Sequence, residues 1–223
     1  IDAVCVSTAI EETNPEIIMA REYAIPVIHR SDLLAAIIET KKTIAVAGTS
    51  GKSTVTAMIF EFLSACGQSP SLISGAPLRR LERQGLVGNA YSGGSELLVV
   101  EADESDGTLV KYRPEISVVL NISKDHRDIF EIKEFFRVLV SRSAWAATNG
   151  DDPLLTDIAS DTTFGEGDSA LWYPDEEVSL PRSVRLLRKG LLYELPYPGK
   201  HNLENLRAAL CVCEHLGCEG TEL

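Results

Sequence analysis

The sequence predicts an α/β protein in which helices cover both faces of a mostly parallel sheet. Three strongly apolar runs, at 43–47, 97–101 and 116–121, have the length of strands and little polar alternation. Strands of this kind are buried on both faces, as they are in parallel sheets. Stretches with apolar residues at helical spacing follow these runs, and such alternation of strand and helix is typical of a three-layer α/β/α architecture.

The N-terminal part of the chain predicts a smaller, partial Rossmann-like βαβα segment. Residues 3–7 form a short apolar strand, and Asn14 followed by Pro15 begins a helix with the asparagine as its cap. A second strand is expected over 26–29. A second helix, Ser31–Glu39, follows with its first residue as the cap, and the polar tripeptide after it marks a domain boundary.

A larger domain begins with the strand at 43–47. The helix after it carries apolar side chains on one face and ends at Gly67. That face consists of Val55, Met58, Ile59, Phe62 and Cys66. Residues 68–94 are rich in Gly, Pro and Ser, so we expect loops with short strands there.

The C-terminal half predicts a helix over 131–140, a turn at 149–153 and a hairpin over 183–195 around Lys189-Gly190. A final helix starts at about Asn202 and again has one apolar face. This face consists of Leu203, Leu206, Leu210 and Cys213.

The composition excludes several classes of protein. The chain has 223 residues, of which 44% are hydrophobic and 24% charged, as in a globular protein with a true core. It contains 21 Lys and Arg residues and 33 Asp and Glu residues, which gives a net charge of −12. We therefore expect no nucleic-acid and no membrane partner, and a phosphate-rich ligand would have to be held locally.

Five cysteines, at positions 5, 66, 211, 213 and 218, contain no Cys-x-x-Cys pair. Most of them fall on apolar helical faces. We expect reduced thiols that fill the core of a cytoplasmic protein. A metal site built from the last three cysteines is the alternative.

The strongest chemical signal lies between a predicted strand and a predicted helix. It is the run GTSGKST, made of Gly48, Thr49, Ser50, Gly51, Lys52, Ser53 and Thr54. The glycines let backbone amides surround phosphate oxygens, the lysine reaches the outer phosphates, and the hydroxyl of Ser53 can bind Mg²⁺. The motif is a variant P-loop, because Val46 stands where the strict pattern has glycine. The alternative is a glycine-rich turn with a solvent-facing lysine.

An acidic run, EADESD at 101–106, follows the apolar strand at 97–101. Ligand sites in open α/β sheets lie at the carboxyl ends of the strands. Glu101 is therefore a candidate ligand for the Mg²⁺ that bridges ATP phosphates. The alternative is a solvated acidic turn.

Two further runs are weaker when taken alone. In NISKDHRD, His126 could bind a metal, and Asp125 and Asp128 could orient it. In GKHNLEN, Asn202 and Asn205 stand at the start of the last helix, where asparagine is also a common cap.

Taken in order, the four runs resemble the Mur ligases, ATP-dependent amide-forming enzymes of peptidoglycan synthesis. The resemblance covers nearly the whole chain: GTSGKST, EADESD, NISKDHRD and PGKHNLEN are similar to the family's phosphate, acidic, histidine and adenine motifs. The segments VSTAI, NPE and IPV before the P-loop are most similar to the branch that adds L-alanine to UDP-N-acetylmuramate.

The resemblance implies a division into domains. Residues 1–40 would be the second half of a UDP-substrate-binding domain, 41–218 a central ATPase, and 219–223 the start of a linker. The other half of the first domain and an amine-binding C-terminal domain would lie outside this chain, so we expect a fragment that does not catalyse ligation alone.

The resemblance also implies the chemistry. ATP and Mg²⁺ would be the cofactors, and a UDP-sugar carboxylate and an amino acid or peptide the substrates. The reaction would form an amide bond through an acyl phosphate. The residues implied are Lys52, Glu101 and His126 for catalysis, GTSGKST for the phosphates, Ser53, Glu101 and His126 for the metal, and Asn202 and Asn205 for adenine or ribose.

Two positions depart from the alanine-adding pattern: Ser50 stands where histidine is usual, and Tyr91 where arginine is usual. They leave open a tripeptide-adding recycling ligase or a folylpolyglutamate-type ligase. A nucleotide-binding paralogue without catalytic activity is the alternative from a different class.

Overall fold

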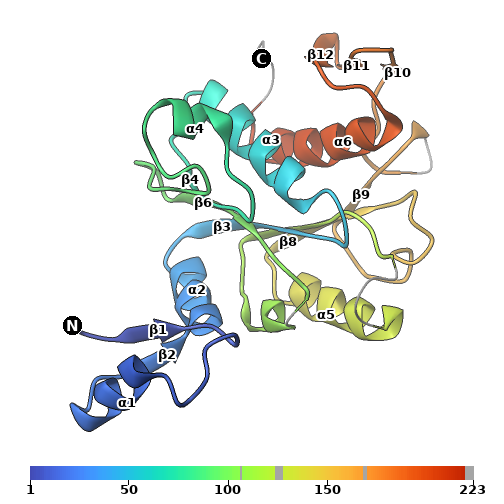
Figure 1. Ribbon diagram of the computed structural model, residues 1–223. Coiled ribbons are helices and arrows are strands. Elements are labelled where there is room, and N and C mark those ends of the chain that lie inside the picture. Colours follow the sequence, from blue (N-terminus) through green and yellow to red (C-terminus); the bar gives the residue numbers. More distant parts are fainter. Residues whose placement is uncertain (106, 124–127, 168–169, 219–223) are drawn as a thin grey trace.

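The computed structural model describes residues 1–105, 107–123, 128–167 and 170–218. Its main sheet has seven strands in the order β5-β4-β6-β3-β7-β8-β9 (Figure 1). All neighbouring strands are parallel except β4 and β5, which confirms the predicted mostly parallel sheet. The strands are β3 (Lys42–Ala47), β4 (Ser71–Ile73), β5 (Ala90–Tyr91), β6 (Leu97–Glu101), β7 (Ile116–Val119), β8 (Trp145–Asn149) and β9 (Thr162–Phe164).

Helices cover both faces of this sheet, as a three-layer architecture requires (Figure 1). Along β3, Ile44 and Val46 join the core cluster under α3 (Lys52–Ala65) and α6 (Lys200–His215). Ala45 and Ala47 point to the opposite cluster. That cluster also contains side chains of α2 (Arg30–Glu39), η1 (Thr108–Lys111) and α5 (Ile129–Ser141).

The N-terminal segment contains the predicted βαβ unit. β1 (Val4–Val6) and β2 (Val27–His29) form a two-stranded parallel sheet, with α1 (Pro15–Glu22) between them in sequence. The side chain of Asn14 accepts a hydrogen bond from the amide of Glu16 at 2.9 Å, which confirms the predicted cap.

The predicted cap of α2 is wrong. The helix begins at Arg30, so Ser31 lies inside its first turn and His29 is the cap. The Nδ1 atom of His29 accepts from the amide of Ser31. Leu34 and Ile38 of this helix pack against the main sheet, so α2 links the N-terminal segment to the larger domain.

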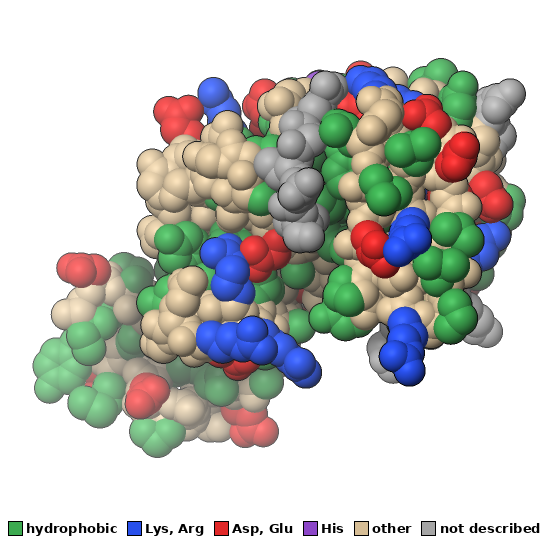
Figure 2. Space-filling model, turned by 90° about the horizontal axis from the view of Figure 1, so that it is seen from above, with side chains coloured by type: hydrophobic (Ala, Val, Ile, Leu, Met, Phe, Trp, Pro, Cys, Tyr) green, Lys and Arg blue, Asp and Glu red, His purple; other side chains and the backbone are tan. Residues whose placement is uncertain are grey.

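Several elements differ from the sequence prediction. A short helix, α4 (Arg79–Arg83), interrupts the predicted loops and short strands at 68–94. The predicted hairpin is present as β11 (Val184–Arg188) and β12 (Leu191–Leu195), and β10 (Glu176–Ser179) extends it to three strands. Figure 2 views this three-stranded sheet and α4 from above, and it shows acidic, basic and apolar side chains intermixed on that face.

The last helix starts two residues earlier than expected. Gly199 is its cap, and the Nδ2 atom of Asn202 donates to the carbonyl of Pro198 at 2.8 Å. Asn202 therefore lies in the first turn and does not cap the helix.

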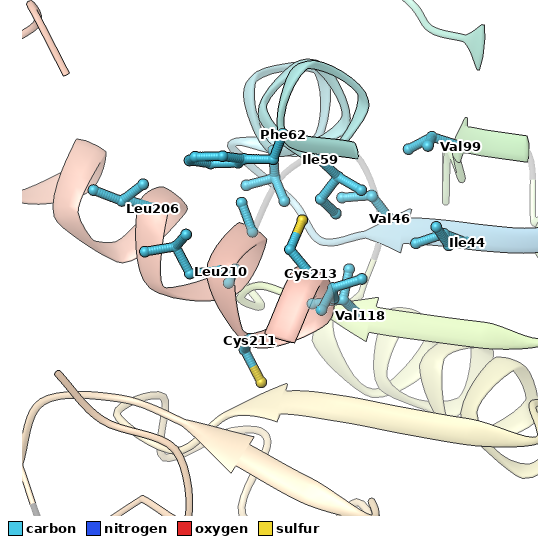
Figure 3. Close-up of a cluster of buried hydrophobic side chains, with 14 of the residues drawn as sticks. Ile44, Val46, Ile59, Phe62, Val99, Val118, Leu206, Leu210, Cys211 and Cys213 are labelled. Atoms are coloured by element: carbon cyan, nitrogen blue, oxygen red, sulfur yellow. The ribbon is translucent and has the colours of Figure 1, made fainter. Parts of the chain in front are cut away.

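A tightly packed apolar cluster fixes α3 against α6. Phe62 and Ile59 of α3 lie in one buried cluster with Leu206 and Leu210 of α6 and Val46 of β3 (Figure 3). Full burial of one such side chain contributes about 1.5–3 kcal/mol relative to exposure. The cluster therefore holds the N-terminus of α3, and the loop before it, in a fixed position.

The prediction of five reduced thiols is wrong for one pair. Cys66 and Cys218 form a disulfide with their Cα atoms 5.9 Å apart, which joins the end of α3 to the residues after α6. Cys211 and Cys213 are buried free thiols, as expected of core residues, and burial raises the pKa of Cys211 to about 12. No group of three or more His, Cys, Asp or Glu in the described residues could hold a metal ion, so the cysteine metal site is not formed.

Within the described residues, no helix is both long and apolar enough to cross a lipid bilayer.

Candidate nucleotide-binding site

The GTSGKST loop lies at the carboxyl end of the central strand. β3 has β6 on one side and β7 on the other, so the residues that follow these strands flank the loop. Gly48 and Gly51 have positive φ angles of 144° and 83°. A Cβ atom at Gly48 would lie 2.9 Å from Leu120 Cβ, and one at Gly51 would lie 2.5 Å from Asn205 Oδ1. Both positions therefore require glycine.

Four backbone amides at the start of α3 are available to an anion. The helix has no side-chain cap, and its first backbone hydrogen bond runs from the Val55 amide to the Gly51 carbonyl at 2.9 Å. The amides of 51–54 have no acceptor within the part of the chain that the structure describes. Free amides at the positive end of a helix dipole are suited to phosphate oxygens.

Asn121, two residues after the end of β7, anchors the other half of the loop. Its Oδ1 accepts from the amide of Ser50 at 2.9 Å, and its Nδ2 donates to the Ser50 carbonyl at 3.0 Å. Its carbonyl accepts from the Thr49 amide at 3.1 Å. The sequence prediction assigned no role to Asn121, although a polar residue at the end of an apolar strand is the signal that could have indicated one.

Lys52 is not a solvent-facing lysine. Its Nζ donates to the carbonyl of Gly48 at 2.8 Å and lies 2.9 Å from Glu104 Oε2. The side chains of Lys52 and Glu104 are only 13% and 6% exposed. The alternative of an exposed lysine on a glycine-rich turn is therefore wrong.

Glu101 faces the same cavity as the loop. A cavity of about 200 Å³ is lined by Thr49, Ser50, Gly51, Lys52, Ser53, Thr54 and Glu101. Gly75 donates its amide to Glu101 Oε2 at 2.7 Å, and this bond fixes the carboxylate at the end of β6. The structure thus brings together the predicted metal ligands Ser53 and Glu101.

The third predicted metal ligand cannot be placed, because His126 and Asp125 lie outside the described residues. Asp128, expected to orient the histidine, is the cap of α5 and accepts from the Phe130 amide at 2.8 Å.

A larger cavity of about 600 Å³ adjoins the first one and shares Ser53 and Thr54 with it. Its wall includes Asn202, Tyr197 and apolar side chains of α3. Asn205 is 9% exposed, and its Oδ1 lies against Gly51. The two asparagines predicted near adenine therefore lie in different places: Asn202 lines the larger cavity, and Asn205 lies against Gly51 of the loop.

The order of these features along the chain matches one known family. A sequence model described as the Mur ligase middle domain matches residues 46–213. The chain belongs to the Mur ligase family. The match contains the phosphate loop, Glu101 and both asparagines, so the two cavities are built from residues of the Mur ligase middle domain.

Two relatives within the Mur ligase family have the same name. The chain is 37% identical over 97% of its length to the UDP-N-acetylmuramate–L-alanine ligases of Methylobacterium sp. (strain 4-46) and Pelotomaculum thermopropionicum. It covers 50% of each, so it spans about half the length of these curated relatives.

Solved Mur ligase structures share the fold. The UDP-N-acetylmuramate–alanine ligase of Thermotoga maritima superposes with a TM-score of 0.81 at 26% identity, over 97% of this chain and 51% of that one. A second structure is a ligase from Neisseria meningitides whose name specifies UDP-N-acetylmuramate and L-alanyl-γ-D-glutamyl-meso-diaminopimelate. It has a TM-score of 0.76 at 23% identity, and the superposition covers 97% of this chain and 74% of that one. At that identity the second likeness shows the fold alone.

The two departures from the alanine-adding Mur ligase pattern have different surroundings. Ser50 lines the phosphate cavity and is bonded to Asn121. Tyr91 packs its ring edge-on against Phe60 of α3, with centroids 5.8 Å apart. Of the two, only Ser50 lies at the cavity.

Proposed function

We propose that this chain is the nucleotide-binding part of an ATP-dependent ligase that joins the carboxylate of UDP-N-acetylmuramic acid to L-alanine in peptidoglycan synthesis. The observation that carries the proposal is the phosphate-sized cavity in which free amides, Lys52, Ser53 and Glu101 converge. The relatives at 37% identity, named UDP-N-acetylmuramate–L-alanine ligases, support the choice of substrates.

The residues present fit ATP and Mg²⁺. The amides of 51–54 and the ammonium of Lys52 would neutralise phosphate oxygens, and Ser53 and Glu101 would hold the metal. ATP supplies the phosphoryl group that converts the carboxylate into an acyl phosphate, from which the amine displaces phosphate. Such chemistry depends on positioning and on charge neutralisation more than on covalent help from the protein.

The larger cavity is suited to the nucleoside. Its volume of about 600 Å³ is within the usual range for small-molecule sites, and it begins at Ser53 and Thr54, beside the phosphate cavity. We assign Asn202 to recognition of the adenine or ribose, because this polar residue lines the cavity. Asn205 would act indirectly, because its Oδ1 lies against Gly51 of the phosphate loop.

The tripeptide-adding recycling ligase is the second candidate, and Ser50 at the cavity is the observation that favours it. A full-length protein containing this chain would decide between the two. Phosphate release should depend on UDP-N-acetylmuramic acid and on L-alanine. Release that depends instead on L-alanyl-γ-D-glutamyl-meso-diaminopimelate would identify the recycling ligase, and binding of nucleotide without release would indicate the non-catalytic paralogue.

The metal assignment predicts a specific loss. Glu101→Gln keeps the shape of the side chain but removes the charge that a divalent cation prefers. We expect Mg²⁺-ATP affinity to fall by about tenfold or more, because a carboxylate beside the metal is worth at least a charge-assisted contact. Calorimetric titration of this chain measures the change.

The control is Glu96→Gln, just before the same strand. Its carboxylate pairs with Lys42 on the surface, and its side chain is 79% exposed. We expect unchanged affinity in this control. Unchanged affinity in Glu101→Gln would remove Glu101 from the metal site.

The chain alone should bind nucleotide but form no amide. The chain contains the residues that line the phosphate cavity. It spans only about half the length of its curated relatives. Correct positioning of reactants is worth about 7–11 kcal/mol of the barrier. We expect no amide product by mass spectrometry from the 223-residue chain with ATP, UDP-N-acetylmuramic acid and L-alanine. Detection of that product would contradict the proposed division of labour among domains.

A further inference from the structure

Glu104 is a buried carboxylate that the proposed mechanism does not use. It follows β6 in the loop that carries Glu101, and the residue is 5% exposed. Its two carboxylate oxygens lie 3.2 and 2.9 Å from Lys52 Nζ. Glu104 does not line the phosphate cavity itself, so it sits behind the lysine.

The pairing changes the charge of the phosphate cavity. Lys52 is the one cation among the residues that line it, and Glu101 is a carboxylate in the same wall. With Glu104 against Lys52, one positive charge faces two negative charges within the described residues. A bare polyphosphate would have to compete with Glu104 for the lysine, whereas a polyphosphate that carries a divalent cation brings positive charge with it.

Asp103, in the same loop, is placed differently. Both carboxylate oxygens of Asp103 accept hydrogen bonds from Ser105, from its amide at 3.1 Å and its hydroxyl at 2.7 Å. Among the described residues of the loop, Glu104 alone is paired with the P-loop lysine. Its effect on anion binding is therefore separable from the general acidity of the segment.

We propose that Glu104 makes nucleotide binding depend on the metal, by holding Lys52 at the Gly48 carbonyl and offsetting its charge until a metal–polyphosphate complex enters. This inference rests on the proposed nucleotide-binding function. Glu104 acts as a positioning residue through Lys52 and does not itself touch the reacting atoms.

The test is calorimetric titration of the chain with ADP, once with Mg²⁺ and once with EDTA. In Glu104→Gln the lysine keeps a neutral hydrogen-bond partner but loses its counter-charge. We expect affinity for metal-free ADP to rise by about tenfold, and affinity for Mg²⁺-ADP to change by less than about threefold. A merely structural role would move both affinities together, so the ratio of the two affinities is the decisive readout.

Asp103→Asn is the matched control, since it removes one negative charge from the neighbouring residue without touching Lys52. We expect the ratio to stay within about twofold of the wild-type value, because exposed charges are largely screened. Glu104→Asp covers the case in which Glu104→Gln does not fold. It keeps the charge but moves it away from Lys52 by one methylene, and we expect an intermediate gain of about threefold for metal-free ADP.

The possible results distinguish a failure of the proposed nucleotide-binding function from a failure of the role of Glu104. If the wild-type chain binds neither form of ADP, the proposed function fails, and this inference fails with it. The second case is a wild type that binds Mg²⁺-ADP and folded Glu104 variants in which the ratio of metal-free ADP affinity to Mg²⁺-ADP affinity does not rise above the wild-type value. The proposed function then stands, and the role of Glu104 is overturned.

Discussion

Lys52→Ala should reduce ATP turnover of a full-length protein containing this chain by about 10²–10³-fold, the usual effect of losing one preorganised donor to developing charge. Lys52 is the one cation lining the phosphate cavity among the described residues, and its position at the Gly48 carbonyl is fixed. Steady-state release of phosphate measures the loss. Turnover at the wild-type level would show that Lys52 has no role in the reaction.

The same variant should also lose stability. Lys52 and Glu104 are a buried pair, with side chains 13% and 6% exposed, so alanine leaves the Glu104 carboxylate without its partner. Breaking a buried pair in this way costs about 3 kcal/mol or more. A solvent-facing lysine, by contrast, would cost within about 0.5 kcal/mol.

A double variant separates the two effects. Lys52→Ala with Glu104→Gln removes both charges, so most of the lost unfolding free energy should return, because no uncompensated charge remains buried. Turnover should stay at the level of the single variant. Recovery of turnover together with stability would mean that the lysine acts only through folding.

The fold could be predicted where the sequence signal is strong and local. The bounds of β6 and the residues of α3 follow from an uninterrupted apolar run and from helical spacing. β8 and β9 were missed because Trp145–Asn149 contains small and polar residues and Thr162–Phe164 is only three residues long. Their strand conformation comes from pairing within the sheet, which is a tertiary effect.

The site could be predicted from the sequence only where a short motif determines the local backbone conformation. The phosphate loop needs glycines in fixed places, and the structure shows why at Gly48 and Gly51. The roles of Asn121 and Glu104 depend on which residues β7 and β6 place beside that loop. The disulfide between Cys66 and Cys218 likewise joins residues 152 positions apart, a proximity that spacing alone does not show.

Arg207→Ala should be strongly destabilising, although Arg207 lies outside the nucleotide site. The Arg207 side chain is 1% exposed on α6, and Nη1 lies 2.9 Å from Asp151 Oδ2. Its Nε and Nη2 bind both oxygens of Glu177 on β10. The guanidinium thus joins the last helix to the turn after β8 and to the three-stranded sheet, and its loss leaves two carboxylates without their cation.

The expected cost is about 3–5 kcal/mol, because the partners of a buried cation cannot recover full hydration. For a chain of this length, each kcal/mol lowers Tm by about 2–4 °C, so Tm should fall by about 10 °C. Calorimetry or circular dichroism measures the shift. Arg207→Lys should give a smaller loss, since lysine keeps the charge but cannot match the bidentate geometry at Glu177.

Arg185→Ala is the matched control. Arg185 also pairs with a glutamate, Glu194, but the two side chains are 47% and 43% exposed. Exposed pairs contribute at most about 1 kcal/mol, so this variant should lose no more than about 4 °C. An equal decrease in Tm in Arg207→Ala and Arg185→Ala would show that the buried ion pairs of Arg207 stabilise the fold no more than an exposed pair does.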